Sequence, residues 1–199
     1  MLLKDFTMDP INIIIGLNII ATFGANISGA KKGLRSALSE AKEKPKTYLQ
    51  KIPLAVSTVT LVVLILALFQ IGTLEYKEEY FTLRLIGLAV YLFFSWVQIW
   101  AYKSLGESYS QEIIIFKKHA LVKKGPFKFI RHPQYFSQIL VDLGGSIAVL
   151  SFLLLPLVFI EIPILILRAL LEEKILQRHF GEQFTEYKKH SGFFIPFLG

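Results

Sequence analysis

The stretch that decides the fold runs from residue 134 to residue 171 and reads QYFSQILVDLGGSIAVLSFLLLPLVFIEIPILILRALL. Charge interrupts it only at Asp142, Glu161 and Arg168. As one α-helix it would be about 57 Å long at 1.5 Å per residue, whereas the hydrocarbon core of a bilayer is about 30 Å thick. The stretch is therefore predicted to form two membrane helices that turn back on each other somewhere around Leu150 to Pro156.

Three further apolar stretches precede this hairpin, each roughly long enough to cross a bilayer as a helix. They run over Pro10–Ala30, Ile52–Gly72 and Phe81–Tyr102. The chain has 199 residues and is 53% hydrophobic, so little of it remains for a separate soluble domain. The predicted fold class is an all-α integral membrane protein with five transmembrane helices. Residues 1–199 form one domain, with three spans in residues 1–102 and a loop, the hairpin and a C-terminal segment in residues 103–199.

The formal net charge of +7 is unevenly distributed. The segments after the first and third predicted spans and the C-terminal tail are basic, whereas the connector TLEYKEEY (residues 73–80) is acidic. By the positive-inside rule the basic segments face the cytoplasm and the N-terminus lies outside. Anionic membrane lipids are then the expected partners of this charge, rather than nucleic acid. We expect a multi-pass protein of the cell membrane whose site faces the cytoplasm.

The segment GPFKFIRHPQY (residues 125–135) stands where the hairpin begins. Gly125-Pro126 marks a turn, and Pro133 suits the first turn of a helix, where its missing N–H costs nothing. Arg131 and His132 therefore lie at the mouth of the fourth span. The neighbouring lysines are interpreted as interfacial anchors whose cationic ends reach the water, but His132, between an arginine and a helix-starting proline, is interpreted as part of a site.

Charged residues inside the predicted hairpin admit more than one interpretation. Arg168 and Glu172 are four residues apart on one helix face, so they form either a simple ion pair near the interface or a cation and a carboxylate that line a pocket. Asp142 and Glu161 are acids within the membrane, where function is the usual suspicion. Their roles stay open, and a pairing of Asp142 with Arg84 near the outer end of the hairpin is one expectation.

Three motifs together resemble the isoprenylcysteine carboxyl methyltransferase family of membrane enzymes and its prokaryotic relatives. They are LGESYS (residues 105–110), HALVKKGPFKFIRHPQY (residues 119–135) and R-x-x-x-E-E-x-x-L-x-x-x-F-G-x-x-F-x-x-Y (residues 168–187). The resemblance covers about residues 104–197. It implies the cofactor S-adenosylmethionine, with S-adenosylhomocysteine as product, bound on the cytoplasmic side by the last two spans and the segments that flank them.

The resemblance also implies where the nucleoside part of the cofactor binds. Adenine recognition maps to the loop at His119, Leu121 and Val122, and Gly125 corresponds to the loop glycine of the family.

The remaining site residues implied by the resemblance lie on the hairpin. The methionine part of the cofactor would be held near Arg131, His132 and Tyr135, and Glu172 would close the site from the last helix. Arg168 matches the arginine that is proposed to orient the acceptor carboxylate. The lipid-like, isoprenoid-type substrate would enter sideways from the bilayer.

The chemistry suits a sparse set of polar residues. A carboxylate acceptor is already ionised at pH 7, so methyl transfer to it from a sulfonium needs no general base and no metal, and none is predicted. The chain has no cysteine, which excludes thiol nucleophiles and cysteine metal sites. An amine acceptor would instead lose a proton and require a base such as Glu172 or His132.

The predicted function is therefore transfer of a methyl group from S-adenosylmethionine to a carboxylate of a lipophilic substrate such as a prenylated cysteine. The alternatives are a phospholipid or amine N-methyltransferase, an NADPH-dependent enzyme similar to sterol reductases, and a non-catalytic membrane scaffold or small transporter subunit. The physiological acceptor and the oligomeric state stay open.

Overall fold

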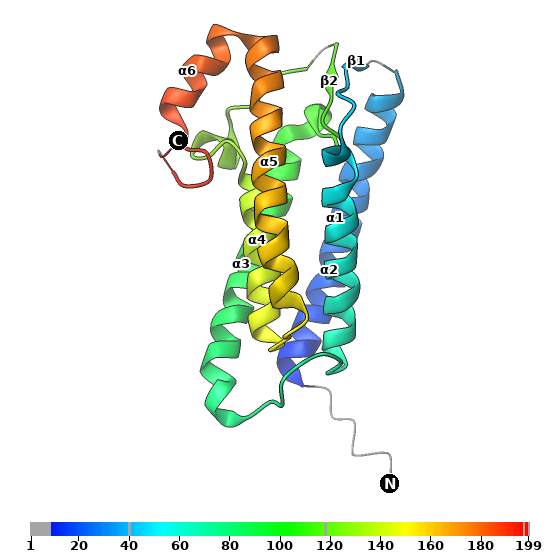
Figure 1. The fold of residues 1–199 in the computed structure, drawn as a ribbon, viewed down its shortest axis with the longest axis vertical. Helices are drawn as coiled ribbons and strands as arrows, with labels where there is room; N and C mark the ends of the chain where they lie inside the picture. The colour runs from blue at the N-terminus through cyan, green and yellow to red at the C-terminus, as the bar shows by residue number, and fades with distance from the viewer. Residues whose placement is uncertain (1–8, 40, 118, 197, 199) are drawn as a thin grey trace.

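The computed structural model describes residues 9–39, 41–117, 119–196 and 198, and for residues 25–39, 41 and 107 it describes the backbone alone. Within these residues the fold is a bundle of long helices that stand side by side, with α6 packed near one end (Figure 1). The helices are α1 (Pro10–Ser39), α2 (Ile52–Leu68), α3 (Phe81–Leu105), α4 (Pro133–Ala148), α5 (Leu154–Phe180) and α6 (Glu182–His190).

Shorter elements connect the helices. The 3-10 turns are η1 (Tyr48–Gln50), η2 (Glu78–Tyr80), η3 (Gly106–Ser108) and η4 (Gly125–Lys128). The strands β1 (Ala41–Glu43) and β2 (Ile115–Phe116) pair antiparallel, so the prediction of a purely helical chain was wrong at this point. Strands of three and two residues are too short to show the alternating pattern from which a strand is predicted.

The predicted hairpin is confirmed. α4 and α5 run antiparallel and are joined by residues 149–153, where Leu150 has a φ of 50°. Pro156 falls within the first turn of α5, where the backbone N–H groups have no partner inside the helix and a missing one costs nothing. The chain therefore reverses just before this proline, within the predicted range.

Three helical segments of the described chain are long and apolar enough to cross a membrane: Tyr48–Leu68, Glu78–Leu105 and Leu154–Phe180. Pro10–Gly24 is a shorter apolar helical stretch. α4 has 16 residues and is about 24 Å long at 1.5 Å per residue. Length and composition thus support three of the predicted spans, and the count of five stays a prediction.

Several helix ends differ from the expected ones. α3 ends at Leu105 instead of Tyr102, and α5 continues past Leu171 to Phe180. α1 continues past Ala30 as far as Ser39, because a run of lysines and small residues does not itself break a helix. α2 ends at Leu68 instead of Gly72. There the chain turns through Gln70, with a φ of 61°, and Gly72, with a φ of 73°.

The closest approach between helices joins α3 and α4. A β-carbon placed on Gly87 would lie 2.7 Å from the backbone nitrogen of Ala148 and 2.8 Å from the carbonyl oxygen of Gly144. One placed on Gly144 would lie 2.7 Å from the backbone nitrogen of Tyr91. The two backbones therefore touch, as glycine permits in membrane helix pairs.

The predicted pairing of Arg84 with Asp142 was wrong. Arg84 instead binds both carboxylate oxygens of Asp9 at 2.6 and 2.9 Å and donates from Nε to the carbonyl of Ala148 at 2.8 Å. Asp142 accepts a hydrogen bond from Gln138 at 2.6 Å. The reason is distance along α4, because Asp142 lies more than one turn before Ala148.

Asp142 and Glu161 face each other within the bundle. Asp142 is within hydrogen-bonding reach of Glu161, and Glu161 accepts from the Ser57 hydroxyl at 3.1 Å. Gln98 donates to Gln138 at 2.5 Å and extends this polar set to α3.

Candidate functional site

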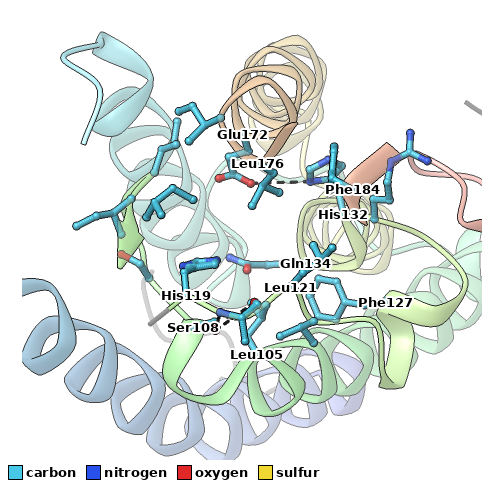
Figure 2. Close-up of a pocket in the computed structure, with 18 of the residues that line it drawn as sticks. Leu105, Ser108, His119, Leu121, Phe127, His132, Gln134, Glu172, Leu176 and Phe184 are labelled. Carbon is cyan, nitrogen blue, oxygen red and sulfur yellow. Dashed lines mark hydrogen bonds and ion pairs between the residues drawn. The ribbon is translucent and has the colours of Figure 1, made fainter. Parts of the chain in front are cut away.

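A cavity lies at the end of the bundle that carries α6, between the end of α3, the loop before η4, the start of α4 and α5 (Figure 2). Its empty space is about 890 Å³ when the open mouth is counted, which is an upper bound on the space for a ligand. The predicted site residues in its lining are His119, Leu121, Val122, Arg131, His132, Tyr135 and Glu172. The structure thus brings together residues from two predicted regions that are far apart in sequence.

Gly125 and Arg168 are the two predicted site residues outside this lining. Gly125 has a φ of 61° and lies against α3, where an added β-carbon would clash with the Ser104 side chain and lie 3.2 Å from Nε1 of Trp100. Its structural role is therefore a tight turn packed on α3. The turn at Gly125 follows the predicted adenine loop, but Gly125 itself does not line the cavity.

Glu173 fixes the two residues that precede the N-terminal end of α4. It lies 2.6 Å from Nε of Arg131, 3.3 Å from Nε2 of His132 and 2.9 Å from Nζ of Lys188. Arg131, His132 and Glu173 are all buried. The sequence interpretation gave Glu173 no role, although the Glu-Glu doublet after Arg168 was a visible signal that two carboxylates point in different directions from α5.

Glu172, the other member of the doublet, points into the cavity. It accepts a hydrogen bond from the Tyr135 hydroxyl, and its Oε2 lies 3.9 Å from Nδ1 of His132 (Figure 2). The His132 and Tyr135 rings are stacked, with an interplanar angle of 10° and centroids 5.8 Å apart. A carboxylate, an imidazole and a phenol thus meet on one side of the cavity.

Arg168 lies behind the cavity wall. Its Nε donates to the Tyr135 hydroxyl at 2.7 Å and lies 3.4 Å from Glu172. Its Nη1 donates to the carbonyl of Leu49 at 3.2 Å, and its Nη2 donates to the carbonyl of Gln111. Arg168 therefore joins α5 to two segments outside the hairpin, and its role toward an acceptor stays a prediction.

The C-terminal tail supports the Arg131–His132 pair from the other side. The backbone N–H of Arg131 donates to the carbonyl of Gly192 at 2.7 Å, and that of His132 donates to Phe193 at 3.3 Å. The Phe193 ring packs edge-on against His132 at 5.0 Å, and the Arg131 guanidinium donates to the Ser191 carbonyl. Sequence reasoning missed these residues, because nothing in the pattern SGFF indicates a contact 60 residues away.

His119 lies on the cavity side opposite Glu172 (Figure 2). Burial, with a smaller contribution from His179, lowers its pKa to about 4. Its ring stacks on Phe116 at 5.7 Å, and its buried Nδ1 has no hydrogen-bond partner among the described residues. His119 is therefore neutral at pH 7, and its ring lines the cavity.

Residues 85–178, which include Arg131, His132, Glu172 and Glu173, match the model of the isoprenylcysteine carboxyl methyltransferase (ICMT) family. The fold is similar to a solved structure of the eukaryotic intramembrane Ras methyltransferase ICMT, with a TM-score of 0.57 and 22% sequence identity. That similarity covers 98% of this chain and 71% of the other. Residues 85–178 are thus similar in sequence to the ICMT family, and the fold of the chain is similar to that of a solved ICMT.

One relative of this chain is bacterial. The protein YpbQ of Bacillus subtilis (strain 168) is 35% identical over 71 residues, which are 36% of each chain. The match thus covers about a third of that relative's length. The match of residues 85–178 to the family model confirms the resemblance drawn from the three motifs, and the Bacillus relative agrees with a prokaryotic origin of that resemblance.

Proposed function

We propose that the protein is a membrane methyltransferase that transfers a methyl group from S-adenosylmethionine to a carboxylate of a lipophilic substrate such as a prenylated cysteine. The observation that carries the proposal is the meeting of His119, His132 and Glu172 around one cavity at the end of an apolar helix bundle. The match of residues 85–178 to the ICMT family model supports the same reaction class.

The chemistry of the cavity lining suits S-adenosylmethionine. Glu172 is a carboxylate in its lining, whereas the charge of Arg131 is balanced by Glu173, and that of Glu112 by Lys44 at 2.6 Å. Such a lining suits a cofactor that carries a sulfonium and an ammonium group. The neutral His119 and Leu121, which also line the cavity, suit a nucleobase.

Each residue then has a simple task. S-adenosylmethionine supplies a methyl group on a leaving group of its own. Arg131 and His132 are held rigid by Glu173 and so give the methionine part a fixed wall. Tyr135 orients the Glu172 carboxylate through its hydroxyl. The protein thus aligns the reactants and excludes water, which is the main catalytic demand of a direct displacement.

The acceptor carboxylate is assigned to Arg168 on the resemblance. A guanidinium pairs well with a carboxylate, and Arg168 lies one turn before Glu172 on α5. Such pairing requires Arg168 to exchange a protein acceptor, such as the Gln111 carbonyl, for the substrate. A carboxylate acceptor is ionised at pH 7 and needs no base.

An amine acceptor is the second candidate, and one observation favours it. The polar donors of Arg168 already bind protein acceptors, whereas the Glu172 carboxylate faces the cavity. Glu172 would then take the proton that an amine must lose. A phospholipid or another lipid amine fits this arrangement.

We also propose that α1 and α4 cross the cell membrane together with α2, α3 and α5. The support is the distribution of charge, because the basic segments after α1 and α3 and the C-terminal tail are expected on the cytoplasmic side. The cavity then faces the cytoplasm, and the isoprenoid part of the substrate enters from the bilayer.

Calorimetric titration of the purified protein in mild detergent with S-adenosylhomocysteine tests the proposal, with NADPH as comparator. We expect micromolar binding of S-adenosylhomocysteine, loss of binding in Glu172→Gln and His132→Ala, and no binding of NADPH. No binding by folded protein would contradict a methyltransferase site. NADPH binding in that case would support the reductase alternative, and no binding of either ligand would support a non-catalytic scaffold. Prenylcysteine and lipid-amine acceptors then separate O- from N-methylation.

A further inference from the structure

One wall of the cavity has little regular structure of its own. It is formed by Glu112, Ile113, Ile114 and Ile115, which lie in the long loop between η3 and η4. Of these residues only Ile115 belongs to a strand, the two-residue β2. A buried loop must satisfy its backbone polar groups through other segments, so the position of this wall depends on what binds it.

Gln50 binds this wall with its side-chain amide. Its Nε2 donates to the carbonyl of Ile113 at 2.9 Å, and its Oε1 accepts from the N–H of the same residue at 2.8 Å. The second N–H of the amide donates to the carbonyl of Pro45 at 3.2 Å. One side chain thus pairs with both polar groups of a residue 63 positions away, as a neighbouring strand would.

A second tie reinforces the first. The carbonyl of Leu49, next to Gln50, accepts a hydrogen bond from Arg168, which also donates to the carbonyl of Gln111. The Leu49 side chain packs in a buried cluster with Ile113, Ile115 and Ile175. Hydrogen bonds therefore hold the wall at residues 111 and 113. Apolar contacts also hold it, because its isoleucines pack between η1 and α5.

We propose that Gln50 is a positioning residue for ligand binding in this cavity, because it fixes the backbone of the wall at Ile113. The proposal rests on the proposed function only for the identity of the ligand. It assigns a role to the N-terminal half of the chain, in which none of the three motifs lies. Ile113 is 3% exposed, so loss of Gln50 leaves a buried peptide group without partners, which is unfavourable.

The physical consequence is a change in the population of the wall's conformations. When the closed wall loses two hydrogen bonds, displaced conformations that expose Ile113 to water gain weight. A ligand that binds only the closed wall then binds more weakly. Its apparent Kd equals the intrinsic Kd divided by the fraction of molecules in which the wall is closed. The same loss leaves the transfer step unchanged once the ligand is bound, because Gln50 does not line the cavity.

The substitution Gln50→Leu nearly keeps the size of the side chain and removes both hydrogen bonds to Ile113, together with the one to the carbonyl of Pro45. The matched control is Gln177→Leu, because Gln177 also bonds through its amide, to Gly181 at 3.0 Å and Thr185 at 2.9 Å, but lies outside the cavity lining. Two measurements apply to both variants: hydrogen exchange of the Ile113 amide in the ligand-free protein, and titration with S-adenosylhomocysteine.

We expect Gln50→Leu to speed exchange at Ile113 and to weaken S-adenosylhomocysteine binding by roughly ten-fold. Gln177→Leu should match the wild type in both. In turnover assays with a methyl acceptor, Gln50→Leu should raise the KM for S-adenosylmethionine and leave kcat within about two-fold. A merely structural defect would lower kcat with the folded fraction and leave KM unchanged, which would overturn the proposal.

Gln50→Glu provides a second test should the leucine variant fail to fold. It keeps an acceptor for the Ile113 N–H but loses the donor to its carbonyl, so an intermediate effect is expected. Wild-type exchange and wild-type affinity in Gln50→Glu would overturn the proposal. If the wild type itself binds no S-adenosylhomocysteine, the proposed function fails, whereas the exchange at Ile113 still decides whether Gln50 holds the wall.

Discussion

The carboxylate of Glu173 lies 3.3 Å from Nε2 of His132, although 41 residues separate the two in the chain. The same carboxylate binds Arg131 and Lys188, so it connects α5 with the mouth of α4 and with α6. Glu172, one residue earlier, faces the cavity instead. Two identical neighbours on one helix thus have different tasks, one in holding the site and one in contacting its ligand.

The same Glu→Gln substitution is predicted to affect protein stability at Glu173 and ligand binding at Glu172. Glu173→Gln should destabilise the protein by about 3 kcal/mol, because it leaves the buried Arg131 without its counter-charge. Glu172→Gln keeps an acceptor for Tyr135 and should change stability little while weakening S-adenosylhomocysteine binding. Thermal unfolding in detergent, followed by tryptophan fluorescence, measures the first effect. Equal unfolding temperatures for the two variants would contradict this division of roles.

The contact between α3 and α4 predicts a strong effect of single methyl groups. Gly87→Ala and Gly144→Ala each place a β-carbon 2.7 Å from a backbone nitrogen, so the two helices must separate. Each substitution should lower the free energy of unfolding by about 1–3 kcal/mol. Gly24→Ala is the control, because its added β-carbon meets no atom within 4 Å. Thermal unfolding of the three variants checks the order, and a Gly144→Ala variant as stable as Gly24→Ala would argue against the close contact.

The Arg84–Asp9 pair predicts non-additive mutations. Arg84→Ala should be destabilising by about 3 kcal/mol, because it removes the counter-charge of Asp9 and the side-chain donor to the carbonyl of Ala148. Asp9→Ala in the Arg84→Ala background should then add little, which is a coupling between the two sites. Asp142→Asn in the same background should simply add its own effect. A coupling of Arg84 with Asp142 instead of Asp9 would restore the pairing expected from the sequence.

His119 predicts a loss of stability in acid. Its pKa in the folded protein, about 4, lies below the ordinary value of 6.5, so between these values the unfolded chain binds a proton that the folded chain does not. The stability linked to His119 is therefore fully present above about pH 6.5 and falls as the pH drops toward 4.

The pH dependence of the unfolding temperature tests this prediction. His119→Gln should show a shallower decline below pH 6.5 than the wild type. The control His190→Gln replaces a histidine whose side chain is 75% exposed and should keep the wild-type slope. Identical slopes for all three proteins would mean that His119 does not set this part of the curve.

The sequence predicted those parts of the site that depend on helix periodicity and on local motifs. The length of residues 134–171 required a hairpin, and an antiparallel hairpin places Tyr135 beside Arg168 and Glu172. The proline at position 133 indicated the start of α4. Each of these inferences uses residues within a few turns of one another or the fixed geometry of a helix pair.

Contacts made by irregular segments could not be predicted in the same way. Gln50 meets Ile113 and Asp9 meets Arg84 because loops and helix ends come together only after the bundle has formed. The tail at Phe193 reaches His132 for the same reason. A polar residue in a connector looks alike whether it contacts water or a distant backbone, so the single sequence carries no period or spacing that distinguishes the two.

α5 runs from Leu154 to Phe180, with Pro163 in its interior, and carries both Glu172 and Glu173. Its 27 residues amount to about 40 Å at 1.5 Å per residue, which exceeds the hydrocarbon thickness of about 30 Å. A long helix adjusts its tilt when the lipid chains around it shorten or lengthen. Because the same helix carries the carboxylates of the site, we expect the acyl-chain length of the surrounding lipids to change the geometry of the cavity even when no ligand is bound.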